Sequence, residues 1–115
     1  MNDLELFEKL ATEQKAGRPV VLATVIDKKG SVPRNTGARM LIWANGSADG
    51  SIGGGCVEAE IRVAARRIHL DSKTPETVNV YLTDRDQGGT GDVCGGHMEV
   101  FLDYLTSEAH IATFQ

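Results

Sequence analysis

One run of apolar residues, Val20–Ile26, most constrains what this chain can fold into. The run is rich in β-branched residues and contains a single polar one, Thr24. This composition is typical of a strand that is buried on both faces. The run is also far shorter than the ~18 apolar residues of a membrane span, and no longer run occurs. We therefore predict a central strand and no membrane segment.

Two stretches with helical periodicity accompany this strand. Residues 3–16 repeat apolar side chains at helical spacing and end at Gly17, with Asn2 or Asp3 as the N-cap. Residues 56–70 repeat apolar side chains at i, i+4, i+7 and i+11, with acidic residues early and arginines late, which suits the helix dipole. The first helix is expected to bury a face made of Leu4, Phe7 and Ala11, with Leu6 and Leu10 beside it.

Apolar runs predict five strands, and Asn45-Gly46 is a strong hairpin signal between two of them. Between the last two strands, Thr83–Gly96 reads as a polar, glycine-rich loop, and a loop of that length is usually functional or mobile. The element order predicts an α/β fold, with α+β as the alternative: a single sheet of about five strands packed by two helices, with the Gly-rich turns at one edge. The strands are expected at Val20–Ile26, Arg39–Ala44, Ser47–Ile52, Thr77–Leu82 and Met98–Leu105.

Length and charge limit the class of protein. The chain of 115 residues fits one domain, 1–115, and its 41% hydrophobic and 24% charged residues are ordinary for a globular protein. Twelve basic and 16 acidic residues give a net charge of −4, which argues against nucleic-acid binding. The first five residues include two acidic side chains, Asp3 and Glu5, and no basic one, whereas a signal peptide starts with basic ones. We expect a cytoplasmic protein with no nucleic-acid or membrane partner.

Glycine and cysteine mark the candidate site. Twelve of the 13 glycines lie between Gly30 and Gly96, and each of the two cysteines, Cys56 and Cys94, adjoins a glycine run. In the cytoplasm two thiols are expected to be reduced rather than joined in a disulfide. Both could be small buried hydrophobic residues, but their shared glycine context favours a role in binding.

The first candidate segment, Ser51–Glu58, passes from a strand through Gly53, Gly54 and Gly55 into a helix that begins at Cys56. Glycines permit positive φ and close approach of the backbone, and a helix start offers N–H groups and a partial positive charge to an anion. A thiol at that position is expected to have a lowered pKa. The spacing matches neither a dinucleotide fingerprint nor a P-loop. Alternatively, the glycines only make a tight turn and Cys56 packs inward.

The second segment, Gly30–Met40, is a turn-rich loop that holds Arg34 and Arg39. Arginines can bind phosphate or carboxylate groups through two parallel hydrogen bonds. The alternative is that Pro33 and Gly37 shape the loop while both arginines are solvated.

The third segment, Asp92–His97, contains a cysteine and a histidine three residues apart. Cys94 and His97 could share a metal, but they lack the paired spacing of a structural zinc site and would point to opposite faces of a strand. We assign His97 no role. We expect His69, near a helix end, and His110, in the tail, to be solvated.

Four of these motifs occur in order through residues 4–105: Gly30–Arg34, Gly37–Met40, Gly50–Glu58, and Cys94–Gly96 ahead of a strand that ends Phe101–Leu105. Together they resemble the XdhC/CoxI family, which are accessory proteins for xanthine dehydrogenase and carbon monoxide dehydrogenase. Because the motifs are linked in one order, the resemblance is far more specific than any single glycine run.

The resemblance implies a molybdenum cofactor-binding accessory or chaperone protein rather than an enzyme. Such a protein holds molybdenum cofactor (molybdopterin), has it sulfurated with the help of a cysteine desulfurase, and delivers it to an apo molybdenum hydroxylase of the xanthine dehydrogenase type. The phosphate of the cofactor suits a helix start and arginines, and thiolates suit a molybdenum or sulfur centre. Cys94 would be the molybdenum ligand. The cofactor-binding residues carried over by motif are Arg34, Arg39, Gly53, Gly54, Gly55, Cys56, Cys94, Gly95 and Gly96.

Many family members continue into a C-terminal Rossmann-type domain, whereas this sequence ends ten residues after Leu105, so we expect either a naturally short member of the family or a fragment of a longer one. Two other functions stay open: a cysteine-dependent enzyme or redox protein, although no general base is evident beside either cysteine, and a docking module without cofactor. A homodimer is favoured, because so short a domain must cover its sheet edges and exposed apolar surface.

Overall fold

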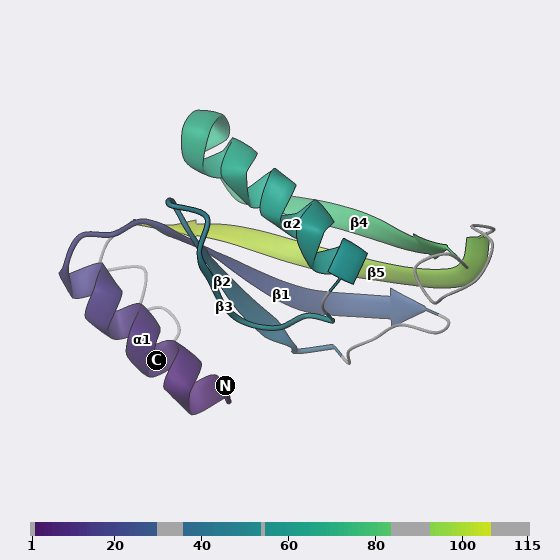
Figure 1. Cartoon of the computed structure of the whole chain (residues 1–115), viewed down its shortest axis with the longest axis horizontal. Helices are drawn as coiled ribbons and strands as arrows, with labels where there is room; N and C mark the ends of the chain where they lie inside the picture. The colour runs from purple at the N-terminus through teal and green to yellow at the C-terminus, as the bar shows by residue number, and fades with distance from the viewer. Residues whose placement is uncertain (1, 30–35, 54, 84–92, 107–115) are drawn as a thin grey trace.

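In the computed structural model, which describes residues 2–29, 36–53, 55–83 and 93–106, the chain forms one antiparallel sheet with a helix on each face (Figure 1). The five strands lie side by side in the order β3-β2-β1-β5-β4. The predicted single sheet of five strands packed by two helices is therefore confirmed. The elements are α1 (Asp3–Lys15), β1 (Val20–Lys29), β2 (Arg39–Trp43), β3 (Ala48–Gly50), α2 (Gly55–Arg67), the π-helical turn η1 (Ile68–Ser72), β4 (Glu76–Thr83) and β5 (Val93–Leu105).

The central strand β1 is buried on both faces over residues 20–25, as its apolar run predicts, but Ile26 at the end of that run is 49% exposed and the strand continues to Lys29. Val21, Ala23 and Val25 point to the side that α2 covers, and Val20 and Leu22 point to the side that α1 covers. All five are at most 3% exposed. Strands β2 and β5 pair with β1 along its two edges, and α2 and α1 cover its two faces, which is why this buried stretch is almost entirely apolar.

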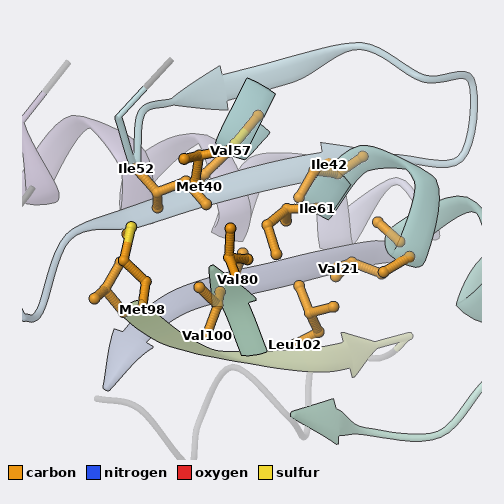
Figure 2. Close-up of a cluster of buried hydrophobic side chains, with 14 of the residues drawn as sticks. Val21, Met40, Ile42, Ile52, Val57, Ile61, Val80, Met98, Val100 and Leu102 are labelled. Atoms are coloured by element: carbon orange, nitrogen blue, oxygen red, sulfur yellow. The ribbon is translucent and has the colours of Figure 1, made fainter. Parts of the chain in front are cut away.

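The larger core lies between α2 and the sheet (Figure 2). Val57, Ile61 and Ile68 come from α2 and the following turn, and Met98 and Val100 come from β5. Burying one such aliphatic side chain contributes about 1.5–3 kcal/mol. This core fixes the start of α2, the candidate site, relative to the sheet.

Helix α1 covers the opposite face of the sheet and packs mainly on β1 and β2. Its N-cap is Asn2, which exchanges hydrogen bonds with Glu5 in a capping box, so the first predicted cap is correct. The buried face consists of Leu6, Leu10 and Gln14, whereas Leu4 is 68% exposed. The predicted buried face was therefore wrong in part, because Leu4, which was predicted to be buried, points to solvent and the polar Gln14 points inward.

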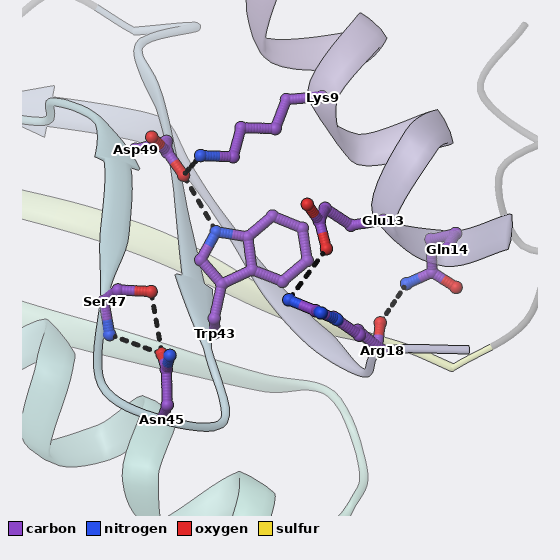
Figure 3. A network of polar contacts seen from close by, with 8 residues as sticks. All are labelled: Lys9, Glu13, Gln14, Arg18, Trp43, Asn45, Ser47 and Asp49. Atoms are coloured by element: carbon purple, nitrogen blue, oxygen red, sulfur yellow. Dashed lines mark hydrogen bonds and ion pairs between the residues drawn. The ribbon is translucent and has the colours of Figure 1, made fainter. Parts of the chain in front are cut away.

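A polar network joins α1 to the β2–β3 hairpin (Figure 3). Trp43 Nε1 donates to Asp49 Oδ2 over 2.8 Å, and Lys9 Nζ forms an ion pair with the same oxygen over 3.0 Å. Burial raises the pKa of Asp49, but the hydrogen bonds from Trp43 and Lys9 and the charge of Lys9 outweigh it, so that the pKa lies below the usual range. The network therefore requires the ionised carboxylate.

The structure corrects several predicted boundaries, and the largest changes concern β5, α2 and β3. The last strand begins at Val93 rather than Met98, so it takes in part of the stretch predicted as the long loop Thr83–Gly96; residues 84–92 lie outside the described residues. The predicted helix 56–70 ends earlier as an α-helix and continues as η1. The second hairpin strand is only Ala48–Gly50. Within the described residues, no helix is long and apolar enough to cross a membrane.

Candidate functional site

The glycine segment that leads into α2 uses backbone conformations that favour glycine. Gly53 has φ +137° and Gly55 has φ +56°, and both values lie in the region that side chains rarely adopt. Gly54, which was also predicted as a site residue, lies outside the described residues. A Cβ built on Gly55 meets no atom within 4 Å, so the backbone at the start of α2 borders open space.

Gly50, at the end of β3, serves a different purpose. It has φ +84°, and a Cβ there would lie 2.7 Å from Arg39 O and 3.2 Å from Leu6 Cδ1. The strand end is therefore packed against β2 and α1, and the turn that follows starts from a fixed position. Gly50 is a packing glycine, whereas Gly55 faces open space.

A carboxylate on the first turn of α2 holds this turn in place. Ser51 donates from Oγ to Glu58 Oε2 over 2.6 Å, and the Ile52 N–H donates to the same oxygen over 3.2 Å. Ser51 Oγ in turn accepts from the Gly53 N–H over 3.2 Å. The sequence motifs did not predict this role of Ser51 and Glu58. An acidic residue in the first turn of a helix that follows a glycine turn was the available signal.

Cys56 lies in the first turn of α2, directly after Gly55. Its backbone position is the one predicted, at the helix start where a thiolate is favoured. Its side chain lies outside the described part of the structure, so the predicted reactivity of this thiol stays a prediction.

The Cys94-Gly95-Gly96 segment lies inside β5 and is not a turn after the loop. The pairing of β4 with β5 is irregular here, because Leu82 pairs with Gly96 whereas Thr83 pairs with Val93. Cys94 and Gly95 thus lie between these two pairs, at a bulge-like shift of the strand register. Bulges re-aim side chains and are frequent near functional sites. The Cys94 side chain lies outside the described part of the chain.

The strand register places both cysteine segments toward the same end of the sheet. Gly50 on β3 pairs with Met40 on β2, Met40 pairs with Ala23 on β1, and Ala23 pairs with Leu102 on β5, so these residues form one row across the sheet. The chain leaves Gly50 in the direction in which β5 begins, and Cys94 precedes Leu102 by eight residues, or about 26 Å of strand. The start of β5 thus extends beyond the first turn of α2 (Figure 1). The predicted sharing of one site by Cys56 and Cys94 stays a prediction.

The predicted arginines differ in what the structure says of them. Arg39 begins β2, and its guanidinium forms an ion pair with Asp3 over 3.1 Å and lies 5.4 Å from the ring centre of Phe7. These contacts connect β2 to α1. Arg34 lies outside the described residues. Among the described residues, no group of three or more His, Cys, Asp or Glu side chains could hold a metal ion.

The candidate site is thus the glycine turn between β3 and α2, which the Glu58 carboxylate holds through hydrogen bonds to Ser51 and Ile52. The chain belongs to the XdhC and CoxI family, whose sequence profile matches residues 13–81. This family is associated with xanthine dehydrogenase. The match includes the Gly50–Glu58 segment, so the predicted resemblance is confirmed.

Two curated relatives and one solved structure are similar to this chain. The uncharacterized protein YqeB of Escherichia coli (strain K12) is 31% identical over 99 residues, which cover 86% of this chain and 18% of the relative. A probable xanthine dehydrogenase subunit of Bacillus subtilis (strain 168) is 34% identical over 90 residues, which cover 76% of this chain and 27% of the relative.

The solved structure is a crystal structure described as a xanthine dehydrogenase from Bacillus halodurans. It is 33% identical, with a TM-score of 0.78, over 98% of this chain and 34% of that chain. The chain therefore spans about a fifth to a third of the length of the proteins it matches.

Proposed function

We propose that this chain assists the maturation of a xanthine dehydrogenase-type molybdenum hydroxylase by binding molybdenum cofactor at the start of α2. In this role it accepts the cofactor during sulfuration by a cysteine desulfurase and hands it to the apo-hydroxylase in the cytoplasm. The observation that carries the proposal is the glycine turn with positive φ at Gly53 and Gly55, which borders open space at Gly55, in a member of this family.

The residues at the turn are compatible with a phosphate-bearing ligand. A helix of 13 residues begins at Gly55. The N–H groups of its first turn have no carbonyl acceptor within the helix, so they can donate to an anion. The open space at Gly55 lets an anion approach the backbone closely. Glu58 Oε2 accepts from the Ser51 hydroxyl and the Ile52 N–H, so this carboxylate is engaged by the loop; its negative charge opposes an anion, and the proposal relies on Arg34 to offset it.

Within this proposal, Gly53, Gly54 and Gly55 hold the phosphate, and Arg34 supplies a counter-charge. Cys94 provides the sulfur ligand for molybdenum, with Cys56 and the glycines Gly95 and Gly96 supporting it. Arg39 is the weakest member of the predicted set, because its guanidinium already contacts Asp3 and Phe7. The cofactor, when bound, is the cargo that the hydroxylase later uses.

Purification from cells that make molybdenum cofactor tests the proposal. Molybdenum measured by mass spectrometry, together with the fluorescence of the oxidised pterin, is expected to copurify with the wild-type protein. Gly55→Ala is expected to lose most of this signal. Gly17→Ala is the matched control, because Gly17 also has a positive φ, +78°, beside open space, at the end of α1. Equal retention by the two variants would show that the turn is only a connector.

The same purification separates the other two functions. Turnover without bound cofactor would favour an enzyme that uses Cys56 or Cys94. If the protein showed neither bound cofactor nor turnover, a docking module would be favoured. Alkylation of the thiols across pH, with and without cofactor, adds a second readout. The proposal expects fast labelling near neutral pH, protection by the cofactor, and loss of retention in Cys56→Ser or Cys94→Ser.

A further inference from the structure

A hollow lies at the end of α2 away from the glycine turn, between the helix and the β2–β3 hairpin. It has a volume of about 380 Å³, and its walls include Trp43, Asn45, Arg62, Arg66 and Leu70. Binding sites for organic ligands start at ~300 Å³, so the hollow can hold a small organic molecule rather than a single ion. Arg66 follows Gly55 by eleven residues, which puts about 16 Å of helix between this hollow and the glycine turn.

The charge in this hollow has one sign. Arg62 and Arg66 are four residues apart and so lie on the same face of α2. Among the described residues that line the hollow there is no aspartate or glutamate, although the whole chain has a net charge of −4. A cleft lined by one sign of charge concentrates ions of the opposite sign.

These two guanidinium groups also lack acidic partners within the described part of the chain, unlike other arginines. There, Arg62 donates only to the Gly46 carbonyl, over 3.3 Å, and Arg66 has no hydrogen bond or ion pair. By contrast, Arg67 forms an ion pair with Glu76, and Arg18 forms one with Glu13. The free donors of Arg62 and Arg66 are therefore available to a ligand with several acceptor oxygens.

Apart from Asn45 and His69, the remaining side chains that line the hollow are apolar. Val63 is 67% exposed and Leu70 is 66% exposed, and both border the hollow. His69, which the sequence predicted to be solvated, is instead half-buried. Its Nε2 donates to the Ile42 carbonyl over 2.9 Å, and its ring packs edge-on against Tyr104. The prediction failed because η1 turns this side chain toward β2, where it forms the floor.

We propose that this hollow binds a small phosphate monoester that carries a ring or a short apolar body. Arg62 and Arg66 bind the phosphate oxygens, and Leu70 and Val63 cover the apolar body. The helix end disfavours an anion slightly, but two guanidinium groups with free donors outweigh that effect. This site is separate from the proposed cofactor site and does not depend on it.

A titration followed by NMR tests the proposal, with phenyl phosphate and inorganic phosphate as probes. Phenyl phosphate is expected to shift the side-chain signals of Arg62 and Arg66 and the ring signals of His69 in a saturable way. It is expected to bind at least fivefold more tightly than inorganic phosphate, and Leu70→Ser is expected to remove this difference. Absence of saturable shifts, or equal affinity of the two probes for the wild-type protein, would overturn the proposal.

Two variants of neighbouring residues distinguish binding at a defined site from an effect of the overall charge of the protein. Arg66→Ala is expected to weaken phenyl phosphate binding at least tenfold, whereas Arg67→Ala, which removes the same charge one residue further on, is expected to change it less than twofold. Equal losses would show that only the overall charge matters, which contradicts a defined site. Gly55→Ala is expected to bind phenyl phosphate normally, so this proposal and the cofactor proposal can fail independently.

Discussion

Substitution of Gly50 by alanine tests whether the glycine turn is positioned by close packing. The added Cβ would lie 2.7 Å from Arg39 O, 3.2 Å from Leu6 Cδ1 and 3.3 Å from Met40 Cα. The leucine methyl group can move, but the two other atoms belong to the backbone of β2, which is paired with both β1 and β3. The added carbon therefore has to displace the end of β3.

Two effects add up in this variant. Holding an alanine at φ +84° costs about 1–2 kcal/mol, because left-handed backbone is unfavourable for a residue with a Cβ. The steric conflict with β2 adds about 1–3 kcal/mol, the usual cost of overpacking. We expect a total loss of about 3.5 kcal/mol in the free energy of unfolding. With an unfolding entropy of about 2.1 cal/mol/K per residue, the melting temperature falls by about 15 °C.

Urea denaturation and thermal melting of Gly50→Ala and Gly17→Ala measure the two effects separately. Gly17 has a similar φ, +78°, but open space around its Cβ position. Its substitution is therefore expected to cost only the backbone strain, about 1.5 kcal/mol or about 6 °C. If the two variants were equally stable, the close packing of Gly50 against β2 would contribute nothing, and the reasoning would be wrong.

Two further substitutions test the attachment of α1. Asp49 has a lowered pKa in the folded protein, so its ionisation stabilises the fold above pH ~4 and this contribution is lost as the pH falls through the folded-state pKa. Asp49→Asn is therefore expected to destabilise the protein at pH 7 but to lose less stability than the wild type between pH 5 and pH 2, as measured by urea denaturation. Gln14→Ala removes the buried hydrogen bond from Gln14 Nε2 to Leu105 O, 2.8 Å long, and is expected to cost about 1–3 kcal/mol, whereas the exposed Glu8→Ala is expected to cost less than about 0.5 kcal/mol.

Elements with strong local signals could be predicted from the sequence. The apolar run of β1, the cap at Asn2 and the hairpin at Asn45-Gly46 each depend on residues that are adjacent or nearly adjacent in the chain. Their predictions succeeded for that reason. The strand order β3-β2-β1-β5-β4 depends instead on pairings between distant segments, such as Val20 with Leu105, and no local pattern encodes it.

The errors also have physical causes. Cys94, Gly95 and Gly96 lack the alternation of a strand, yet pairing of Val93 and Gly96 with β4 on either side of the irregularity moves the start of β5 back to Val93. The inward turn of Gln14 is stabilised by a backbone carbonyl 91 residues away, which no helical periodicity reveals. Tertiary hydrogen bonds thus override local preference in both places.

The candidate site combines both kinds of information. The motif from Gly50 to Cys56 looks like one glycine-rich unit in the sequence, but its glycines divide into two classes in the structure. Gly50 is close-packed and fixes where the turn begins, and Glu58 fixes how the turn meets the helix. Gly55 borders open space and is the position where a ligand can approach the backbone. A substitution at Gly50 should therefore reduce stability first and binding only as a consequence, whereas one at Gly55 should reduce binding more than its strain alone explains.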